Sequence, residues 1–351
     1  MNSLPAVIFD NVSIVFGETP NKALPLMDQG QSRSEIQQST GQILGVHDCT
    51  LKVAEGEILV LMGLSGSGKS TLLRAVNGLN PVARGSVQVN DRGKMVDVTN
   101  ADRKTLRGLR LSTIAMVFQQ FGLLPWRTVR ENVGLGLELG GLSAAARKAK
   151  VDDQLARVGL ADWADKSVGS LSGGMQQRVG LARAFVTDAP ILLMDEPFSA
   201  LDPLIRTRLQ DELLDLQRDL KRTIIFVSHD LDEAFKIGNR IAIMEGGRIV
   251  QCGTPQEIFT NSANEYVADF VAHMNPLGVL RACDVMVPAA QNGANPSSVV
   301  EPQCSVKDLM TRLETCDEIA VQDAGAVVGY VTTQAVLTAL NNPQNTSHPR
   351  S

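Results

Sequence analysis

The sequence predicts an α/β fold in which helices surround a largely parallel β-sheet. Three apolar runs have the composition of buried strands, namely residues 57–62, 191–194 and 223–227. Glycine-rich or polar residues follow each run, and stretches with the three- and four-residue apolar spacing of helices lie between the runs. Because parallel strands place their carboxyl ends at one edge of a sheet, we expect the polar residues after these runs to face one crevice.

The first run leads into GLSGSGKST, residues 63–71, and then into a helix-forming stretch. A strand, a glycine loop and a helix in this order indicate a phosphate-binding loop, or P-loop, and the alternative is a glycine-rich turn without a ligand. Glycines let backbone N–H groups approach phosphate oxygens, while Lys69 would reach the β- and γ-phosphates and Ser70 would place its hydroxyl on Mg²⁺. The predicted nucleotide-binding residues of the loop are Gly63, Ser65, Gly66, Ser67, Gly68, Lys69, Ser70 and Thr71.

Length and composition limit the possible functions. With 351 residues, the chain is expected to hold one large domain and a smaller appendage. Its net charge of −5 provides no general attraction to nucleic acid, which is therefore not an expected partner. The five cysteines include no CxxC pair, which indicates scattered thiols and no metal site. No signal peptide and no apolar run of ~18–20 residues is present, so we expect a cytosolic protein whose membrane role requires a partner.

The N-terminal residues predict a strand followed by an insertion. Residues 7–16 alternate like a strand, and Phe16 at its end could stack on an adenine ring or fill the core. Residues 20–45 then interrupt the sheet pattern. Within them we expect a short helix starting at Ser34, before a strand resumes at Val46.

The middle of the chain changes from mixed to helical character. Residues 85–90 alternate like a hairpin strand, 100–110 are basic and helical, and 111–118 form another apolar run that ends at Gln119. The pattern then lacks strands and keeps helical spacing. A helical subdomain is therefore predicted at about residues 122–182.

A serine and two glycines, Ser172, Gly173 and Gly174, precede a further helix. Ser172 lies where a helix N-cap belongs, and the glycines leave backbone donors open to an anion. Such a turn is usually only a cap. Because it follows the helical stretch at about residues 128–168, we expect it to lie far from the phosphate loop of its own chain. A second copy placed head to tail could bring it over the nucleotide.

Two carboxylates and a histidine follow the remaining apolar runs. At the edge of a sheet beside a P-loop, Asp195 can order Mg²⁺ through water, and Glu196 can orient or deprotonate the attacking water. The alternative is a strand that ends in solvated acids. His229 follows the last run; a lone histidine is usually structural, but its place at the same edge favours a phosphate contact. Between them, residues 199–202 form a tight connection into the amphipathic helix 203–220.

The C-terminal part differs in composition from the rest. A hairpin is predicted at residues 241–251. The main domain is predicted to end near residues 260–272 and is given the range 1–272. Polar and small residues predict a linker over 273–303, followed by a small α+β piece over 304–341 and a disordered tail over 342–351.

In order and spacing, these motifs resemble those of the ATP-binding subunits of ABC transporters, over about residues 7–255. The resemblance includes GLSGSGKST as Walker A, the Gln119 loop, LSGGMQQR as the signature, ILLMDE as Walker B, SALD as the D-loop and His229 as the switch histidine. It implies a P-loop NTPase core with an antiparallel β subdomain and a helical subdomain. The signature has Met175 where many members have Gln, which leaves the backbone donors in place.

The resemblance also implies a head-to-tail homodimer with ATP and Mg²⁺ at two sites. By that resemblance Glu196 is the general base, His229 contacts the γ-phosphate, and Phe16 stacks on adenine. The remaining implied assignments are catalytic roles for Gln119 and Lys69, Mg²⁺ contacts for Ser70, Gln119 and Asp195, a contact with the partner's γ-phosphate for Ser172, Gly173 and Gly174, and a link between sites for Asp202. The implied partners are integral-membrane permease subunits and, through them, a substrate-binding protein, at the cytoplasmic face of a bacterial inner membrane.

Further details resemble the bacterial importers of glycine betaine, proline or choline. These details are the inserted helix, the segment 201–206 and the string SHDLDEA at 228–234. Such importers carry tandem CBS modules after the ATPase, and here about half of one pair is recognisable, chiefly at 326–331. A short tail of this kind is similar to that of the choline-importing members.

Two other classes of function are weighed against an importer ATPase. A soluble ABC ATPase acting on nucleic acid or ribosomes would be expected to carry two cassettes or long coiled-coil insertions. This chain has one cassette and an acidic balance. A regulatory module in which the tail is the main functional part would need a larger tail.

Overall fold

The computed structural model describes residues 5–199, 201–272, 274–288 and 298–341. They form two compact units: one takes in the chain up to His229 with Ala242–Ile249, and the other takes in Asp230–Ile241 with the chain from Val250 on. The second unit begins earlier than the boundary predicted at residue 272. One reason is that residues after 250 pack against residues beyond 272. For example, the Gln256 side chain donates to the Val279 carbonyl at 3.3 Å.

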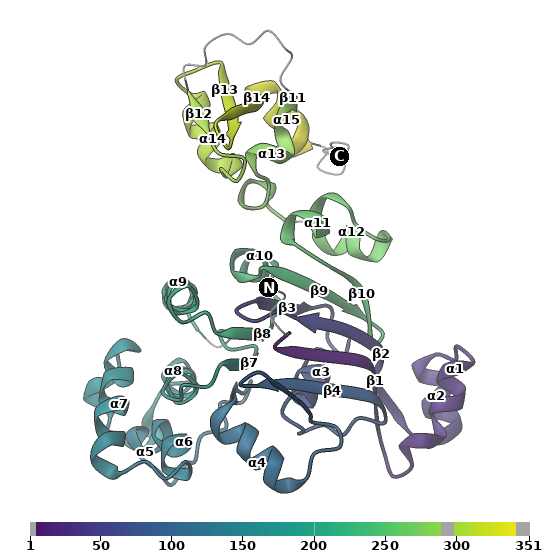
Figure 1. The fold of residues 1–351 in the computed structure, drawn as a ribbon, viewed down its shortest axis with the longest axis vertical. Helices are drawn as coiled ribbons and strands as arrows, with labels where there is room; N and C mark the ends of the chain where they lie inside the picture. The colour runs from purple at the N-terminus through teal and green to yellow at the C-terminus, as the bar shows by residue number, and fades with distance from the viewer. Residues whose placement is uncertain (1–4, 200, 273, 289–297, 342–351) are drawn as a thin grey trace. The chain divides into compact units, whose positions relative to one another are not determined.

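An antiparallel sheet in the first unit has the strand order β2-β1-β4-β5. Figure 1 labels β2, β1 and β4 of this sheet. Its strands are β1 (Val7–Phe16), β2 (Ile43–Val53), β4 (Arg84–Asp91) and β5 (Lys94–Asp97). The strand predicted from Val46 begins earlier, because Ile43 pairs with Phe16. The register therefore places Phe16 and Ile43 side by side at one end of the sheet.

The second sheet has the order β10-β9-β3-β8-β7-β6 and carries the three predicted apolar runs. Its strands are β3 (Ile58–Met62), β6 (Ile114–Val117), β7 (Ile191–Asp195), β8 (Thr223–Val227), β9 (Arg240–Glu245) and β10 (Arg248–Gly253). Strands β3, β8, β7 and β6 pair in parallel, and every residue of β3, β7 and β8 is buried. The predicted strand over 111–118 starts only at Ile114, because helix α4 (Arg103–Ser112) extends to Ser112.

Helix α3 (Lys69–Ala75) follows the phosphate loop and contacts both sheets. It touches β2 of the antiparallel sheet and β7 and β8 of the parallel sheet. Leu72 and Leu73 are completely buried there. The start of α3, and with it the phosphate loop, is therefore fixed between the two sheets.

The helical subdomain is confirmed as a helix cluster with its own apolar core. It consists of α5 (Val129–Val133), α6 (Leu135–Leu139), α7 (Ala144–Arg157) and α8 (Gly173–Phe185), which gather at one side of the first unit (Figure 1). Among the residues of this core are Val133, Leu155, Leu160 and Val179. After α8, helix α9 (Pro203–Leu220) leads to β8.

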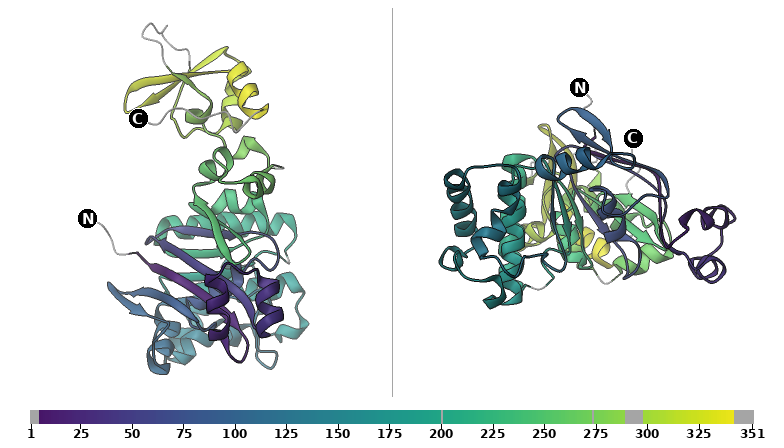
Figure 2. Two further views of the ribbon diagram at one scale, coloured as in Figure 1. Left: turned by 90° about the vertical axis from the view of Figure 1, so that its right-hand side faces the viewer. Right: turned by 90° about the horizontal axis from the view of Figure 1, so that it is seen from below.

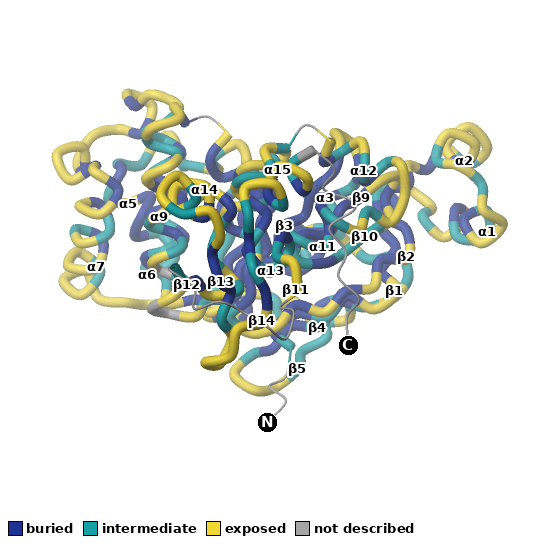
Figure 3. Tube along the Cα trace, turned by 90° about the horizontal axis from the view of Figure 1, so that it is seen from above, coloured by how far each residue is buried: buried dark blue, intermediate teal, exposed yellow. Residues whose placement is uncertain are grey.

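The insertion between β1 and β2 forms α1 (Leu24–Asp28) and α2 (Arg33–Thr40) after a 3₁₀ turn at Pro20–Lys22. Figure 2 shows it projecting at the opposite side of the first unit from α5–α8. Helix α2 begins at Arg33, earlier than predicted, because Ser32 and not Ser34 is the N-cap. Much of α1 and α2 is exposed (Figure 3), but Met27 and Ile36 are buried against β1 and β2.

The second unit holds more structure than predicted. Its elements are α10 (Leu231–Ile237), α11 (Pro255–Thr260), α12 (Glu265–Val271), α13 (Ala282–Val285), β11 (Val287–Pro288), β12 (Val299–Val300), α14 (Val306–Leu313), β13 (Glu318–Asp323), β14 (Ala326–Thr332) and α15 (Thr333–Asn341). A sheet of order β11-β14-β13-β12 forms its C-terminal part. The predicted linker over 273–303 is wrong in its described residues, because they contribute α13 and two strands of this sheet. Residues 289–297 and the predicted tail over 342–351 lie outside the described residues.

Three further findings concern the described residues. None of their helices combines the length and apolar character that crossing a bilayer would require. No group of three or more His, Cys, Asp or Glu among them could hold a metal ion. The cysteines among them, five in number, are free thiols.

Replacing Leu155 with Ala should lower the free energy of unfolding by about 2–5 kcal/mol, because a completely buried leucine would leave a cavity between helices. Urea unfolding followed by circular dichroism measures the change. Leu139→Ala is the matched control, since Leu139 is 52% exposed on α6. Equal unfolding free energies for the two variants would contradict the packing described here.

Candidate active site

A cavity of about 790 Å³ lies where the phosphate loop meets the ends of the parallel strands. Most of the predicted site residues line it. Its lining consists of Phe16, Arg33, Gln37, Ile43, Leu44, Gly45, Ser65, Gly66, Gly68, Lys69, Ser70, Thr71, Gln119, Glu196 and His229. The expected crevice at the carboxyl edge of the sheet is therefore present.

The phosphate loop has the backbone conformation that its glycines were expected to provide. Gly63 and Gly68 have φ values of +138° and +101°, where side chains are strained, and a Cβ on Gly63 would clash with the Met244 carbonyl. Lys69 starts helix α3, and its Nζ donates to the carbonyls of Gly63 at 2.7 Å and Leu64 at 3.0 Å. Burial lowers the pKa of the Lys69 ammonium, while the Glu196 and Asp195 carboxylates oppose that shift.

Asp195 ends strand β7 and is completely buried. Its two oxygens accept from Ser70 Oγ at 2.6 Å and from Arg74 Nη2 at 2.9 Å. A hydroxyl that donates its proton keeps two lone pairs, so Ser70 can still offer an oxygen ligand to a cation in the cavity. A hydroxyl beside a carboxylate fits the oxygen ligands that Mg²⁺ prefers.

Glu196 follows directly and gathers two other predicted residues around its carboxylate. Gln119 Nε2 donates to Glu196 Oε2 at 3.0 Å, and His229 Nδ1 lies 3.5 Å from the same oxygen. The Glu196 backbone has φ +48°, a strained value that its N–H bond to the Val227 carbonyl helps to hold. The three side chains come from the ends of three adjacent strands, as the parallel topology requires.

Phe16 ends β1 at the rim of the cavity. Its ring lies against Gly45, where a Cβ would come within 2.9 Å of the ring. The residue is 37% exposed and lines the cavity, which argues against a purely core role. Stacking on adenine stays a prediction.

Ser172, Gly173, Gly174 and Asp202 do not line this cavity. The Ser172 hydroxyl accepts from the Met175 N–H at the start of α8, and Asp202 accepts from the Ile205 N–H at the start of α9. Gly173 is exposed, with no heavy atom near the place of a Cβ. Within one chain Ser172 and Asp202 are helix caps, Gly173 and Gly174 begin α8, and all four residues lie outside the lining of the phosphate-loop cavity.

Sequence reasoning missed several residues of the site. Arg33 and Gln37 enter the cavity from the inserted helix α2, and Arg74 neutralises Asp195 from one turn beyond Ser70. The sequence could have predicted Arg74, because it lies four residues after Ser70 and residues four apart share a helix face. Arg33 carries no such signal, since its place depends on how the insertion folds.

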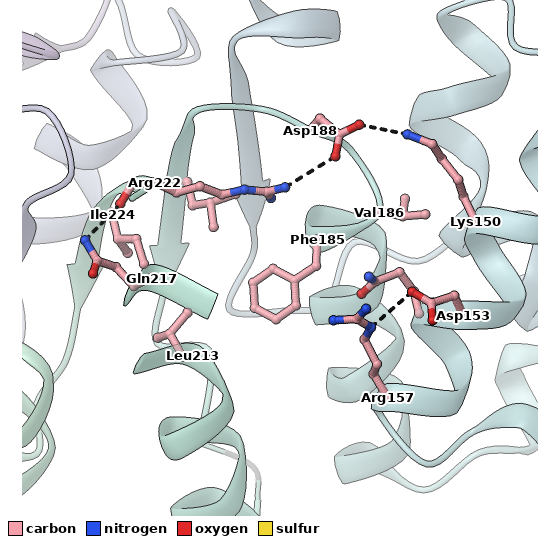
Figure 4. A pocket seen from close by; sticks show the side chains of 12 residues that line it. Lys150, Asp153, Arg157, Phe185, Val186, Asp188, Leu213, Gln217, Arg222 and Ile224 are labelled. Carbon is pink, nitrogen blue, oxygen red and sulfur yellow. Dashed lines mark hydrogen bonds and ion pairs between the residues drawn. The ribbon is translucent and has the colours of Figure 1, made fainter. Parts of the chain in front are cut away.

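A second cavity, of about 420 Å³, lies among α7, the end of α8 and α9 (Figure 4). Phe185, Leu213 and Ile224 form apolar parts of its wall. Its charges pair with one another: Lys150 with Asp188 at 2.7 Å, and Arg157 with Asp153 at 3.0 Å. It holds none of the predicted site residues, so the phosphate-loop cavity is the candidate active site.

Comparisons with known proteins agree with this geometry. The family model for ABC transporters matches residues 46–199. The glycine betaine/proline betaine transport system ATP-binding protein ProV of Escherichia coli (strain K12) is 44% identical over 334 residues, 95% of this chain and 82% of that protein. The trimethylamine N-oxide transport system ATP-binding protein TmoW of Ruegeria pomeroyi is 42% identical, over 96% of this chain and 97% of its own length.

Solved structures point the same way. A dimeric ATP-binding cassette in a post-hydrolysis state, bound to ADP and Pi, is similar with a TM-score of 0.61 and 29% identity. The similarity covers 71% of this chain and 98% of that one. A phosphate loop facing a glutamate and a histidine, together with relatives that are 44% and 42% identical over 82% and 97% of their lengths, shows that this chain belongs to the family of ABC transporter ATP-binding proteins.

Proposed function

We propose that this protein is the ATP-hydrolysing subunit of an importer for small methylated amines. One observation carries the proposal: the cavity brings the phosphate loop, Gln119, Glu196 and His229 together. The names of two similar transport proteins, ProV and TmoW, support the class of substrate. The soluble ATPase alternative has no comparable support.

ATP would bind along the phosphate loop with its adenine on Phe16. Lys69 would exchange the Gly63 and Leu64 carbonyls for the β- and γ-phosphates, which are stronger acceptors because they are charged. Mg²⁺, held by Ser70 with Asp195 and Gln119, would neutralise charge that develops on the phosphates.

Hydrolysis requires a water aligned with the γ-phosphate. Glu196 would accept its proton, since this carboxylate faces the cavity and the Gln119 amide holds its orientation. His229, whose Nδ1 lies 3.5 Å from the same carboxylate oxygen as the Gln119 amide, would contact the γ-phosphate.

The complete site would need a second copy of the chain. Ser172, Gly173 and Gly174 present open backbone donors that have no local anion, and a head-to-tail dimer would bring them over the partner's nucleotide. Asp202 would link the two sites across that dimer. The similar cassette with ADP and Pi is dimeric, which supports this arrangement.

The other partners follow from the transport role. Permease subunits in the membrane would receive the closing motion through the Gln119 segment and the helical subdomain. The ATPase would thus be peripheral, at the cytoplasmic face of a bacterial inner membrane. A substrate-binding protein would act through the permease, and the CBS-like tail stays a prediction.

Replacing Glu196 with Gln should abolish ATP turnover while leaving ATP binding intact, because the amide keeps the shape of the base but cannot take a proton. Gel filtration with ATP should then show a stable dimer. Phosphate release measures turnover. Glu314→Gln, an exposed change after α14, is the control that should behave as wild type. Turnover of the Glu196 variant near the wild-type rate would reject the assignment.

The substrate is proposed from two comparisons that differ in detail. ProV supports glycine betaine, whereas TmoW matches this chain almost end to end and supports trimethylamine N-oxide as the second candidate. The short tail favours choline by resemblance. All three substrates are small and carry a methylated nitrogen.

A strain lacking this chain should lose uptake of labelled glycine betaine, and the gene should restore it. Labelled trimethylamine N-oxide and choline, tested in the same strain, decide between the candidates. The Glu196→Gln gene is the matched control and should not restore uptake. Unchanged uptake of all three compounds in the deletion strain would reject the proposed substrate class.

A further inference from the structure

One arginine of the inserted helix α2, Arg33, donates a hydrogen bond to the phosphate loop. Arg33 Nη1 donates to the Gly66 carbonyl at 2.7 Å, and Nη2 donates to the Gly45 carbonyl at 2.5 Å. Gly66 lies within the loop, whereas Gly45 lies on β2. One planar guanidinium therefore joins the loop to the antiparallel sheet through two separate nitrogens, whereas a lysine has only one nitrogen for both carbonyls.

Helix α2 is built to hold this arginine in place. Ser32 and Glu35 form a capping box around its first turn, with Glu35 Oε2 accepting from the Ser32 N–H at 2.7 Å. One turn after Arg33, Ile36 is completely buried with Met27 and Leu44. The helix start is thereby fixed, and so is the direction from which Arg33 approaches.

One accepting carbonyl belongs to a glycine of the loop, Gly66, and the other, that of Gly45 on β2, lies next to a second loop glycine, Gly68. Gly66 has φ +76°, and no heavy atom lies within 4 Å of the place of a Cβ, so side-chain contacts do not restrain it. The Gly45 carbonyl lies close to Gly68, where a Cβ would come within 2.6 Å of it. Arg33 thus restrains the loop directly at Gly66 and, through Gly45, at Gly68.

The charge of Arg33 is not cancelled within the described residues. Its acceptors are neutral carbonyls, and no ion pair joins it to a carboxylate there. Its Nε is buried without an acceptor in that same part of the chain. Since Arg33 and Lys69 line the same cavity, both charges favour a phosphate chain in it.

We propose that Arg33 is a positioning residue that holds the phosphate loop in its nucleotide-binding conformation, so that the insertion sets the affinity for ATP. The proposal rests on the proposed ATP site at residues 63–71. It gives the insertion, which the motifs of the cassette leave without a role, a function at the site.

The test compares the full-length wild type with Arg33→Ala and Arg33→Lys. In nucleotide-free protein, hydrogen exchange of the amides over 63–70 should become faster in both variants, because alanine has no donor and lysine offers one nitrogen in place of the two separate nitrogens that bind Gly66 and Gly45. The dissociation constant for ATP should rise about tenfold in Arg33→Ala and less in Arg33→Lys, which keeps the charge. The affinity of the variants for ADP should fall in parallel, since the phosphate loop would hold the phosphates of ADP too.

Two controls separate this role from a general effect. Gln38→Ala removes an exposed side chain of the same helix, and Arg107→Ala removes an exposed cation on α4; both should leave exchange and affinity unchanged. Exchange over 33–40 reports whether α2 stays folded. If Arg33→Ala melts α2, Arg33→Lys carries the test.

The proposal would be overturned if both Arg33→Lys and Arg33→Ala kept the amide exchange rates over 63–70 and the dissociation constant for ATP within twofold of wild type. So would a loss of affinity without faster loop exchange, because Arg33 would then act on the nucleotide alone. Exchange needs no nucleotide, so a failure of the ATP-site assignment would appear separately, as a wild-type protein that binds no ATP.

Discussion

The hydrogen bond from Ser70 to the buried Asp195 carboxylate joins the phosphate loop to the end of strand β7. Arg74 neutralises the same carboxylate from helix α3, so one charged group fixes both the loop and the strand. Glu196 follows Asp195, and the parallel pairing of Asp195 with Val227 sets where the chain leaves β8 toward His229. The relative places of the phosphate cradle, the proposed base and the histidine all depend on this bond.

Local patterns predicted the elements that carry this edge. Continuous apolar runs identified β3, β7 and β8, because strands buried on both faces need apolar residues throughout. The glycine loop was predicted from the order of strand, glycine-rich segment and helix, and the Ser172 turn from its capping composition. Gln119, Glu196 and His229 could be placed together because parallel strands end at one edge.

Contacts between distant parts of the chain were not predictable in this way. Arg33 reaches a carbonyl 33 positions away, and no periodicity marks an arginine for that purpose. The strand in residues 299–300 pairs with β13 although its surroundings are polar and rich in small residues, the usual signs of a linker. Ser32 is the N-cap of α2, and its N–H donates to Glu35 Oε2. Because Ser34 lies only two residues away, the sequence alone did not show which serine begins the helix.

We propose that one chain supplies only half of each ATP site, and mixed dimers test this proposal most directly. Lys69→Ala disables the phosphate loop and Ser172→Arg disables the turn, so each homodimer should be inactive. Heterodimers of the two variants, isolated through two different tags, retain one site with an intact Lys69 facing an intact Ser172. Their ATPase activity should rise to as much as about half of wild type. Heterodimers as inactive as both parents would contradict the shared site.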